Sequence, residues 1–429
     1  MIKRAFLFYL TLIVMLPLPL FGYLDPGSGS MLFSAVVGIV ATLFFVIKGA
    51  FFKILDIPSY ISGVKRSDKK KRSIVFYSEG PQYWNVFLPI IRELSERGVP
   101  LTYLSSKEND IGLKCNFPGV ETKFIGEGNR AFFFLNTLSA DLCIMTTPGL
   151  DVLQIKRSKG VKKYIHIPHS TGGGCSGYAT YGTDYYDAVL TGGDSDVEFI
   201  RELEQVRNLP AKDLTVIGCT YMDILREKVL ALPSLPSERI TVLLSPTWGL
   251  HGLLRKYGEK ILSYLTSFNE YNIIARPHPQ GWISDKELLD DLKSKFPDSN
   301  HLFWDKAPDG IESMKKADIM ISDFSGIIFD FILLFEKPVL AFKGNYDKRG
   351  HDSMDIKEDP WVLQAVEKTG ISIEEKDIEN LKELMSAKLL NSAEFKHHLE
   401  FIHESMDKFP KESGKRGTDK IMEIMEHLE

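Results

Sequence analysis

From Ser73 onward, short apolar runs alternate with stretches in which apolar residues recur every three or four positions. Short apolar runs bounded by turn residues are typical of buried strands, and the longer periodic stretches are typical of amphipathic helices. Strands that alternate with helices in this way indicate βαβ units and a parallel sheet covered by helices on both faces. The pattern therefore predicts an α/β fold.

The predicted strands form two series with a proline-rich segment between them. The first series is 74–77, 101–104, 123–125, 142–145, 164–167, 188–191 and 215–218. The second series is 241–245, 272–275, 301–304, 318–321 and 338–342. We expect two doubly wound domains that face a cleft. Their expected bounds are 73–231 and 239–372, with a linker at 232–238 and a polar helical tail at 373–429.

The N-terminal part has a different pattern, with two uncharged apolar stretches. Residues 5–21 follow two basic residues, and residues 31–47 follow a turn-rich connector. A helix needs at least about 17 apolar residues to cross a bilayer, and both stretches reach that length. We expect residues 1–56 to form a membrane anchor. It is either a transmembrane hairpin or a signal peptide followed by one transmembrane segment.

A basic cluster follows the anchor, because six of the eight residues at 65–72 are Lys or Arg. Basic residues beside a membrane segment stay on the cytoplasmic side and are attracted to anionic lipid head groups. We therefore expect residues 57–72 to form a juxtamembrane linker, with the catalytic domains on the cytoplasmic side of the cell membrane. The alternative is a solvated linker without lipid contact.

Composition and charge narrow the function classes. The chain of 429 residues is 44% hydrophobic and 25% charged, as in ordinary globular proteins. Its net charge of −5 argues against a nucleic-acid-binding surface. The four cysteines, at 115, 143, 175 and 219, show neither a disulfide framework nor zinc-ligand spacing. We therefore expect a reducing compartment and no metal site.

The most informative motif is a strand-to-helix turn in the second series. Ser322, Asp323 and Ser325 stand between a buried-strand pattern and an apolar helical run at 327–335. Such a turn leaves free N–H groups at the helix N-terminus, which suits phosphate. We expect Asp323 to bind hydroxyl groups or orient a neighbour, and Asp330 to support the site. The alternative for the turn is a plain N-cap.

A cation and an imidazole follow another strand, in Arg276-Pro-His278-Pro279. Arginine offers a fixed charge and paired donors for phosphate oxygens, and the prolines stiffen the turn. With the turn at 322–325, this motif suggests that a diphosphate is bound at the carboxyl edge of the sheet. The alternative is a rigid loop with a surface ion pair.

A glycine-rich turn in the first series is the third motif, Ile167-Pro-His-Ser-Thr-Gly-Gly-Gly174. Glycines let the backbone approach a ligand, and His169 at the cleft edge can act as a general base at neutral pH. We expect His166 to face the opposite way or the core. The alternatives are a loop with an incidental histidine, a metal site at His166 and His169, or Cys175 as a nucleophile. The metal site is disfavoured because no carboxylate or cysteine lies at ligand spacing.

In this order, across two α/β domains, the motifs resemble those of the CDP-glycerol glycerophosphotransferase family, which comprises teichoic-acid primases and polymerases. The family's His-Gly-Thr motif matches His169-Ser170-Thr171, and its Arg-x-His-Pro motif matches Arg276–Pro279. Its Ser-Asp-Tyr-Ser-Ser motif, which leads into Asp-Phe, matches Ser322–Gly326 followed by Asp330-Phe331. Supporting matches are Pro246-Thr247-Trp248, Asp223–Leu225 and Lys337–Phe342. The resemblance covers residues 73–350.

Three positions depart from the family pattern. Gly172–Gly174 stand where the family continues with Pro-Leu-Lys, Thr220-Tyr221 replace a Pro-Arg pair, and Gly249 stands at a basic position. The resemblance therefore implies a divergent member.

The resemblance implies a GT-B-like fold, with two Rossmann-like domains and the site in the cleft. It implies transfer of glycerol phosphate, or a related alditol phosphate, from a CDP-linked donor to a lipid-linked or polymer acceptor in envelope polymer synthesis. The expected catalytic residues are His169 and His278. The expected substrate contacts are Arg276, Ser322, Asp323, Ser325, Ser170, Thr171, Thr247 and Asp330. Apart from the donor substrate no cofactor is expected, and envelope-assembly proteins are possible partners.

Two alternatives stay open at this point. The same phosphate-binding parts can serve a GT-B glycosyltransferase that uses a nucleotide sugar. The missing basic residues are also compatible with an inactive membrane-anchored scaffold, which would bind no nucleotide.

Overall fold

The structure is a computed structural model that describes residues 72–169, 171, 174–233, 239–307, 309–344, 348–368, 372–390 and 392–428. The expected membrane segments at 5–21 and 31–47 lie outside the described residues. Within the ranges given, no helix combines the length and the apolar character that a bilayer span requires. All described residues belong to one compact unit, residues 71–429.

A seven-stranded sheet forms the centre of the first lobe. Its strand order is β3-β2-β1-β4-β5-β6-β7, and all neighbouring strands are parallel. The strands are β1 (Arg72–Ser78), β2 (Leu101–Ser105), β3 (Val120–Phe124), β4 (Ser139–Met145), β5 (Gly160–His166), β6 (Ala188–Thr191) and β7 (Asp213–Val216).

A six-stranded sheet forms the centre of the second lobe. Its order is β10-β9-β8-β11-β12-β13, again parallel throughout. The strands are β8 (Ile240–Leu244), β9 (Tyr271–Ala275), β10 (Leu302–Trp304), β11 (Ile319–Ser322), β12 (Val339–Phe342) and β13 (Ser372–Ile373). Each predicted strand overlaps an observed one, which confirms two parallel α/β sheets. Among the described strands only β13 has no predicted counterpart, because two residues are too few to show a pattern.

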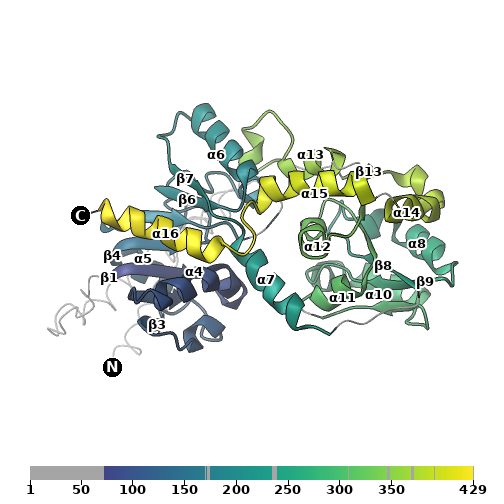
Figure 1. The fold of residues 1–429 in the computed structure, drawn as a ribbon, viewed down its shortest axis with the longest axis horizontal. Coiled ribbons are helices and arrows are strands. Elements are labelled where there is room, and N and C mark those ends of the chain that lie inside the picture. Colours follow the sequence, from purple (N-terminus) through teal and green to yellow (C-terminus); the bar gives the residue numbers. More distant parts are fainter. Residues whose placement is uncertain are drawn as a thin grey trace, which may run out of the picture. The chain divides into compact units, whose positions relative to one another are not determined.

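Helices connect the strands and cover both faces of each sheet (Figure 1). The first lobe has α4 (Trp84–Glu96), α5 (Asn129–Asn136), α6 (Asp194–Val206) and α7 (Thr220–Ala231). The second lobe has α8 (Leu253–Thr266), α9 (Gly281–Ser284), α10 (Lys286–Lys295), α11 (Ile311–Lys316), α12 (Ile327–Phe335), α13 (Trp361–Lys368) and α14 (Leu381–Leu390). The last two helices are α15 (Ser392–Met406) and α16 (Ser413–Glu426). The 3₁₀ turns are η1 (Pro81–Tyr83), η2 (Ile111–Lys114), η3 (Gly174–Gly177), η4 (Asp352–Met354) and η5 (Glu375–Asn380).

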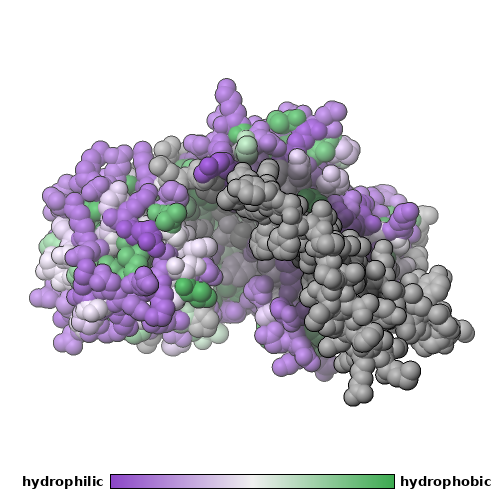
Figure 2. All heavy atoms as spheres, turned by 180° about the vertical axis from the view of Figure 1, so that it is seen from behind, coloured by the Kyte–Doolittle hydropathy of each residue, from purple (hydrophilic) through white to green (hydrophobic). Residues whose placement is uncertain are grey.

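The central strands are continuous apolar runs because both of their faces are buried. In β1, Ile74 and Phe76 belong to the core on one face, and Val75 and Tyr77 belong to the core on the other. The second lobe also has two cores, one on each face of its sheet. The described surface in Figure 2 is mostly hydrophilic, with hydrophobic residues in small separate groups. Burial on both faces therefore explains the pattern seen in the sequence.

The C-terminal helices return to the first lobe (Figure 1). The expected start of a helical tail at residue 373 falls inside β13, and η5 and α14 pack on the second-lobe core. Helix α15 contacts both α12 and α6, and α16 packs on α4 and α7. Gly414 and Gly417 allow this close approach, because a Cβ at either position would come within 2.7 Å of Pro89 or Ile90.

Candidate active site

Both sheets reverse their strand order beside their first strand. This point lies between β1 and β4 in the first lobe and between β8 and β11 in the second. Ligands of open parallel sheets bind outside the carboxyl ends of the strands at such points. The Ser322–Gly326 turn leaves β11 there, and Thr247 follows β8 there. The fold thus places the second-lobe motif where a ligand is expected.

His169 lies just beyond β5, between two aromatic rings. Tyr83 meets it edge-on, with ring centroids 5.1 Å apart, and Tyr178 stacks on it at 5.9 Å with 25° between the ring planes. Burial lowers the pKa of His169 below its ordinary value, and a hydrogen bond to the Thr146 backbone opposes that change. The ring is therefore neutral at pH 7, which is the form that a general base needs.

His166 faces the core, as expected. It is fully buried, and its Nε2 forms a hydrogen bond of 2.9 Å with the hydroxyl of Tyr178. Burial, with a smaller effect of the nearby His169, lowers the pKa of His166 to about 3. Among the described residues no group of three or more His, Cys, Asp or Glu side chains is placed to hold a metal ion. His166 is therefore a structural neutral histidine.

The motifs of the two lobes meet at Thr171 and Asp330. The Thr171 hydroxyl, from the turn after His169, donates a hydrogen bond of 2.5 Å to Oδ1 of Asp330 on α12. Gly326, which caps the N-terminus of α12, also lies near the Thr171 carbonyl, since a Cβ on it would be 3.7 Å from that oxygen. Burial raises the pKa of Asp330 to about 6, and the Thr171 hydrogen bond opposes this rise. The end of α12 therefore faces the turn that carries His169.

Asp323 orients a neighbouring loop, which is one of the two roles expected for it. It is 2% exposed, and its carboxylate accepts hydrogen bonds from the amides of Thr247 at 2.9 Å and Leu253 at 3.0 Å. Asp285 holds the same loop from the other side through the amide of Gly249 at 2.7 Å. Burial raises the pKa of Asp323 to about 6, although these amides favour its charged form. The loop from Thr247 to Gly252 is therefore fixed by two carboxylates.

Ser322 has a different place from the one expected. It is fully buried, and its hydroxyl donates to the carbonyl of Ser245 at 2.6 Å. The expected phosphate contact is corrected for this residue, because its hydroxyl is used to join β11 to the end of β8. Ser325 is half-buried, so of the two serines only Ser325 is left for a ligand.

Arg276 is also buried, and it is paired within the protein. It is 4% exposed, and its Nη1 donates to Asp305 at 2.7 Å and to the carbonyl of Ala307 at 2.9 Å. This ion pair is buried, in contrast to the surface pair that was the alternative. Arg276 therefore fixes the Pro277–Pro279 turn on the end of β10, and its charge acts on the site from within the protein.

His278 is the exposed member of its motif. Its Nδ1 accepts a hydrogen bond from the amide of Gln280 at 3.1 Å, so the neutral ring carries its proton on Nε2. Burial of part of the ring and the charge of Arg276 lower the pKa of His278. The Trp248 ring lies 6.4 Å from the imidazole, between their centroids. His278 can therefore present Nε2 as a hydrogen-bond donor to a ligand oxygen.

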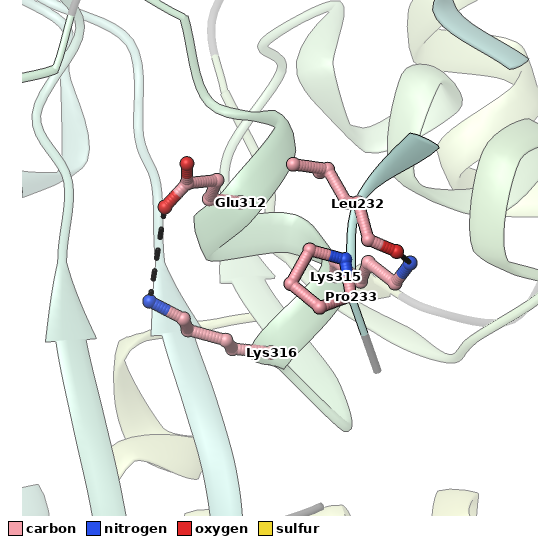
Figure 3. Close-up of a pocket in the computed structure, with 5 residues that line it drawn as sticks. All are labelled: Leu232, Pro233, Glu312, Lys315 and Lys316. Carbon is pink, nitrogen blue, oxygen red and sulfur yellow. Dashed lines mark hydrogen bonds and ion pairs between the residues drawn. The ribbon is translucent and has the colours of Figure 1, made fainter. Parts of the chain in front are cut away.

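A separate pocket lies at the end of α7, away from these motifs (Figure 3). Its lining residues are Leu232, Pro233, Glu312, Lys315 and Lys316. Lys315 donates to the carbonyls of Val229 and Leu232, and Lys316 pairs with Glu312 at 3.9 Å. Because Lys315 caps a helix end, this pocket is part of the connection between the lobes.

The structure thus joins Thr171 with Asp330, and Asp323 with Thr247, from motifs far apart in the sequence. Ser170 lies outside the described residues. The sequence analysis missed Tyr83 and Tyr178, which enclose His169, and Asp305, which holds Arg276. Aromatic residues in loops and an aspartate after a short strand carry no signal of these contacts, so only the fold reveals them.

Two kinds of comparison with known proteins found matches, one to a family model and one to solved structures of similar fold. Residues 225–360 match the family model described as CDP-glycerol:poly(glycerophosphate) glycerophosphotransferase. No curated protein matched the sequence.

Solved structures with a similar chain trace include enzymes of several kinds. The structure of S. aureus MnaA with UDP is 11% identical, with a TM-score of 0.52 and coverage of 83% of this chain and 97% of that chain. The UDP-GlcNAc 2-epimerase from Neisseria meningitidis bound to UDP-GlcNAc is 13% identical, with a TM-score of 0.50 and coverage of 83% and 100%. The wall teichoic acid polymerase TagF soaked with CDPG is 14% identical, with a TM-score of 0.49 and coverage of 89% and 98%.

At these identities the first two likenesses concern the fold alone, and they agree with two Rossmann-like lobes. The family match is of a different kind, because it spans the Arg276–Pro279 motif and the Ser322–Asp330 motif in the expected order. The resemblance to the CDP-glycerol glycerophosphotransferase family that the motifs indicate is thereby confirmed by a family model that matches residues 225–360.

Proposed function

We propose that this protein transfers glycerol phosphate, or a related alditol phosphate, from a CDP-linked donor to a hydroxyl of a lipid-linked or polymer acceptor. The product is a teichoic-acid-type polymer of the cell envelope. The observation that carries the proposal is the hydrogen bond between Thr171 and Asp330. It brings the turn of His169 to a helix that lies inside the family match.

His169 is the general base in this proposal. Its neutral ring takes the proton of the acceptor hydroxyl, and that oxygen forms a bond to the phosphorus that carries the alditol. The bond from this phosphorus to the bridging oxygen breaks, and CMP leaves with the bonding electrons. Supporting this role, burial lowers the pKa of His169, so no proton has to be removed before the ring accepts one.

Charge on the diphosphate is stabilised from the second lobe. The Nε2 proton of His278 and the Ser325 hydroxyl donate to phosphate oxygens, and the N-terminal amides of α12 add their partial positive charge. Arg276 supports this from its buried position and holds the His278 turn. Thr247, on the loop fixed by Asp323, forms the opposite wall of the donor site.

Membrane association completes the proposal. The acceptor is lipid-linked, and residues 1–56 hold the two lobes at the cytoplasmic face of the membrane. We expect that deleting residues 1–56 leaves donor binding unchanged within about twofold and slows reaction with acceptor in bilayers by at least about tenfold, through lost local concentration. Rates with a detergent-soluble acceptor are the control. Equal bilayer rates for both proteins would contradict the role of the anchor.

The test is a panel of donors applied to the full-length protein. CDP-glycerol, CDP-ribitol, CMP and several UDP-sugars are compared by thermal shift and by release of CMP or UDP. A ligand at 100 times its dissociation constant adds about 2.7 kcal/mol of stability, which raises the melting temperature visibly. Stabilisation and CMP release with a CDP-alditol alone are expected. Turnover of a UDP-sugar instead would show a glycosyltransferase, and no binding at all would show a scaffold.

A further inference from the structure

A segment of the second half of the chain packs directly on the loop beside His169. After β12 the chain reaches the first lobe, where His351 forms an antiparallel bridge with Ala179. The amide of Asp352 donates to the carbonyl of Tyr178 at 2.8 Å. In Figure 1 the segment that precedes α13 lies beside α6. No residue of this contact belongs to a motif recognised above.

The carboxylate of Asp352 is built into that loop. Asp352 is fully buried, and it accepts hydrogen bonds from the amides of Tyr181 at 2.7 Å and Gly182 at 2.9 Å. Tyr181 has φ of 72°, a left-handed conformation that a non-glycine residue adopts at a cost. Gly182 has no room for a side chain, because a Cβ would lie 2.6 Å from Cβ of Tyr178. Asp352 therefore holds the loop in a conformation that it would not adopt alone.

Arg207, at the end of α6, fixes Asp352 in turn. Its Nη2 donates to Asp352 at 2.8 Å, and its Nη1 donates to Asp184 at 2.7 Å. A third carboxylate, Asp355, accepts from its Nε at 2.8 Å and is more exposed. The Arg207 guanidinium also lies 4.9 Å from the ring centre of Tyr181. The network is charged, buried and satisfied, so it is rigid.

The loop presents Tyr178 to His169. The Tyr178 ring stacks on the imidazole, and its hydroxyl is held by His166 on the other side. Tyr83 meets the imidazole edge-on, and the Thr146 backbone forms a hydrogen bond with it. The orientation of His169 therefore depends on where the loop places Tyr178.

We propose that Asp352 is a positioning residue for His169, acting through the Tyr178 loop. The proposal rests on the proposed function, because it takes His169 as the base. Asp352 does not touch the reacting atoms. It couples the second lobe, which holds the donor, to the base that activates the acceptor. A displacement of a reacting group by about 1 Å can cost about 100-fold in rate, which sets the size of the expected effect.

The kinetic test compares Asp352→Asn with Asp355→Asn. The second variant is a matched control, because it removes a partner of the same Arg207 without touching the loop. Asp352→Asn is expected to lower kcat by about 100-fold with the donor KM changed less than about threefold, whereas Asp355→Asn stays within about twofold of wild type. The low-pH limb of kcat/KM should also move to higher pH in Asp352→Asn, because a displaced Tyr178 exposes His169 to water. Equal kcat in the two variants would overturn the proposal.

A second readout does not need activity. Diethyl pyrocarbonate modifies neutral imidazoles according to their exposure, and mass spectrometry can follow His169 against the exposed His278 in the same molecule. The ratio of the two rates should rise at least about fivefold in Asp352→Asn and stay unchanged in Asp355→Asn. An unchanged ratio in folded Asp352→Asn overturns the proposal.

Two further outcomes are separable. If Asp352→Asn does not fold, Tyr178→Leu is used instead, because it removes the stacked ring while the Asp352 contacts to Tyr181 and Gly182 remain. The same rise in the rate of His169 modification is then expected. If that rate does not rise, the proposal is overturned. If the wild-type protein transfers no alditol phosphate, the proposed function fails. The modification ratio then still decides whether Asp352 positions His169.

Discussion

The environments of His169 and His278 differ, in agreement with the opposite roles proposed for the two side chains. His169 is enclosed by aromatic rings and is neutral without a partner on Nδ1 among the described residues, which suits a proton acceptor. His278 is exposed and has its Nδ1 occupied by the Gln280 amide, which suits a donor from Nε2. In the proposed mechanism, one residue type therefore serves as base in one lobe and as hydrogen-bond donor in the other.

Replacing either histidine by alanine should remove turnover and leave the fold. General acid–base catalysis contributes about 10² to 10⁴ in rate, so kcat of His169→Ala should fall by at least about 100-fold. The kcat of His278→Ala should fall by a similar factor, because the variant lacks a hydrogen-bond donor to the charge that develops on the phosphate oxygens. Steady-state kinetics with the active CDP-alditol measure kcat of the two variants, and circular dichroism shows whether each variant is folded. Wild-type turnover in a folded variant would remove that residue from the mechanism.

Asp330 gives a pH-dependent stability with a definite sign. Its pKa is raised to about 6, so the folded state holds the proton more tightly than the unfolded state does. Ionisation therefore costs stability as pH rises from about 4 to about 6, and the cost persists at neutral pH. Asp330→Asn keeps an oxygen for the Thr171 hydroxyl and has no charge. It should be more stable than wild type at pH 7 by about 1–2 kcal/mol, a value reduced for partial exposure, and equal near pH 4.

Denaturant unfolding at the two pH values measures the Asp330 effect. Thr171→Val is the control, since it removes the hydrogen bond without removing the charge. A stability difference between Asp330→Asn and wild type that is the same at both pH values would show that the carboxyl does not titrate between them.

Residue roles were the hardest part to predict from the sequence. Ser322 and Arg276 stand at strand ends, which is where ligand contacts occur, so the pattern favoured that role. Their actual partners, the Ser245 carbonyl and Asp305, lie 77 and 29 residues away. Burial at such a position is decided by tertiary contacts, and one sequence does not contain them.

At the scale of elements, the loop from Thr247 to Gly252 is held by Asp323 and by Asp285. Asp323 accepts its first amide and the first amide of α8, so it acts as a cap supplied by another strand. The elements themselves were predictable, since strands buried on both faces give apolar runs such as Ile319–Ile321. The capping role of Asp323 was not predictable, because the helix that it caps begins 70 residues upstream.

Asp323→Ala should therefore destabilise the second lobe and weaken donor binding together. One buried and one partly buried amide lose their acceptor, each at a cost of about 1–3 kcal/mol, so a loss of about 2–6 kcal/mol is expected. Thermal unfolding measures the stability, and calorimetric titration with the CDP-linked donor measures the affinity. Lys315→Met, which removes a cap at the distant end of α7, is the control and should leave donor affinity unchanged. Unchanged affinity in Asp323→Ala would separate the loop from the donor site.

At the scale of the whole molecule, the contact between α16 and α4 joins the last described helix to the first. Gly414 lies against the backbone of Pro89, where a Cβ would be 2.7 Å from the carbonyl oxygen. At Gly417 the nearest atom is the flexible end of the Ile90 side chain, also at 2.7 Å. The two glycines therefore differ in what must move when a methyl group is added.

Gly414→Ala should cost about 1–3 kcal/mol, because backbone has to shift. Gly417→Ala should be nearly neutral, since the gain in helix propensity of about 1 kcal/mol offsets the movement of Ile90. Chemical unfolding of both variants tests this, with activity at low temperature as a check on the native state. Equal destabilisation of the two would show that α16 can slide on α4.

The packing of α16 on the first lobe also determines when this lobe can complete its folding during synthesis. Domains usually fold from the N-terminus while the ribosome is still working. Here Ile421 and Ile424 belong to the same core as Phe76 and Phe87, which are made some 340 residues earlier. The part of this core that α4 lines therefore stays incomplete until Ile421 and Ile424 have been synthesised. A nascent chain of this protein must keep that part of the core protected, and a ribosome that stalls within the second lobe would leave it exposed to chaperones and proteases.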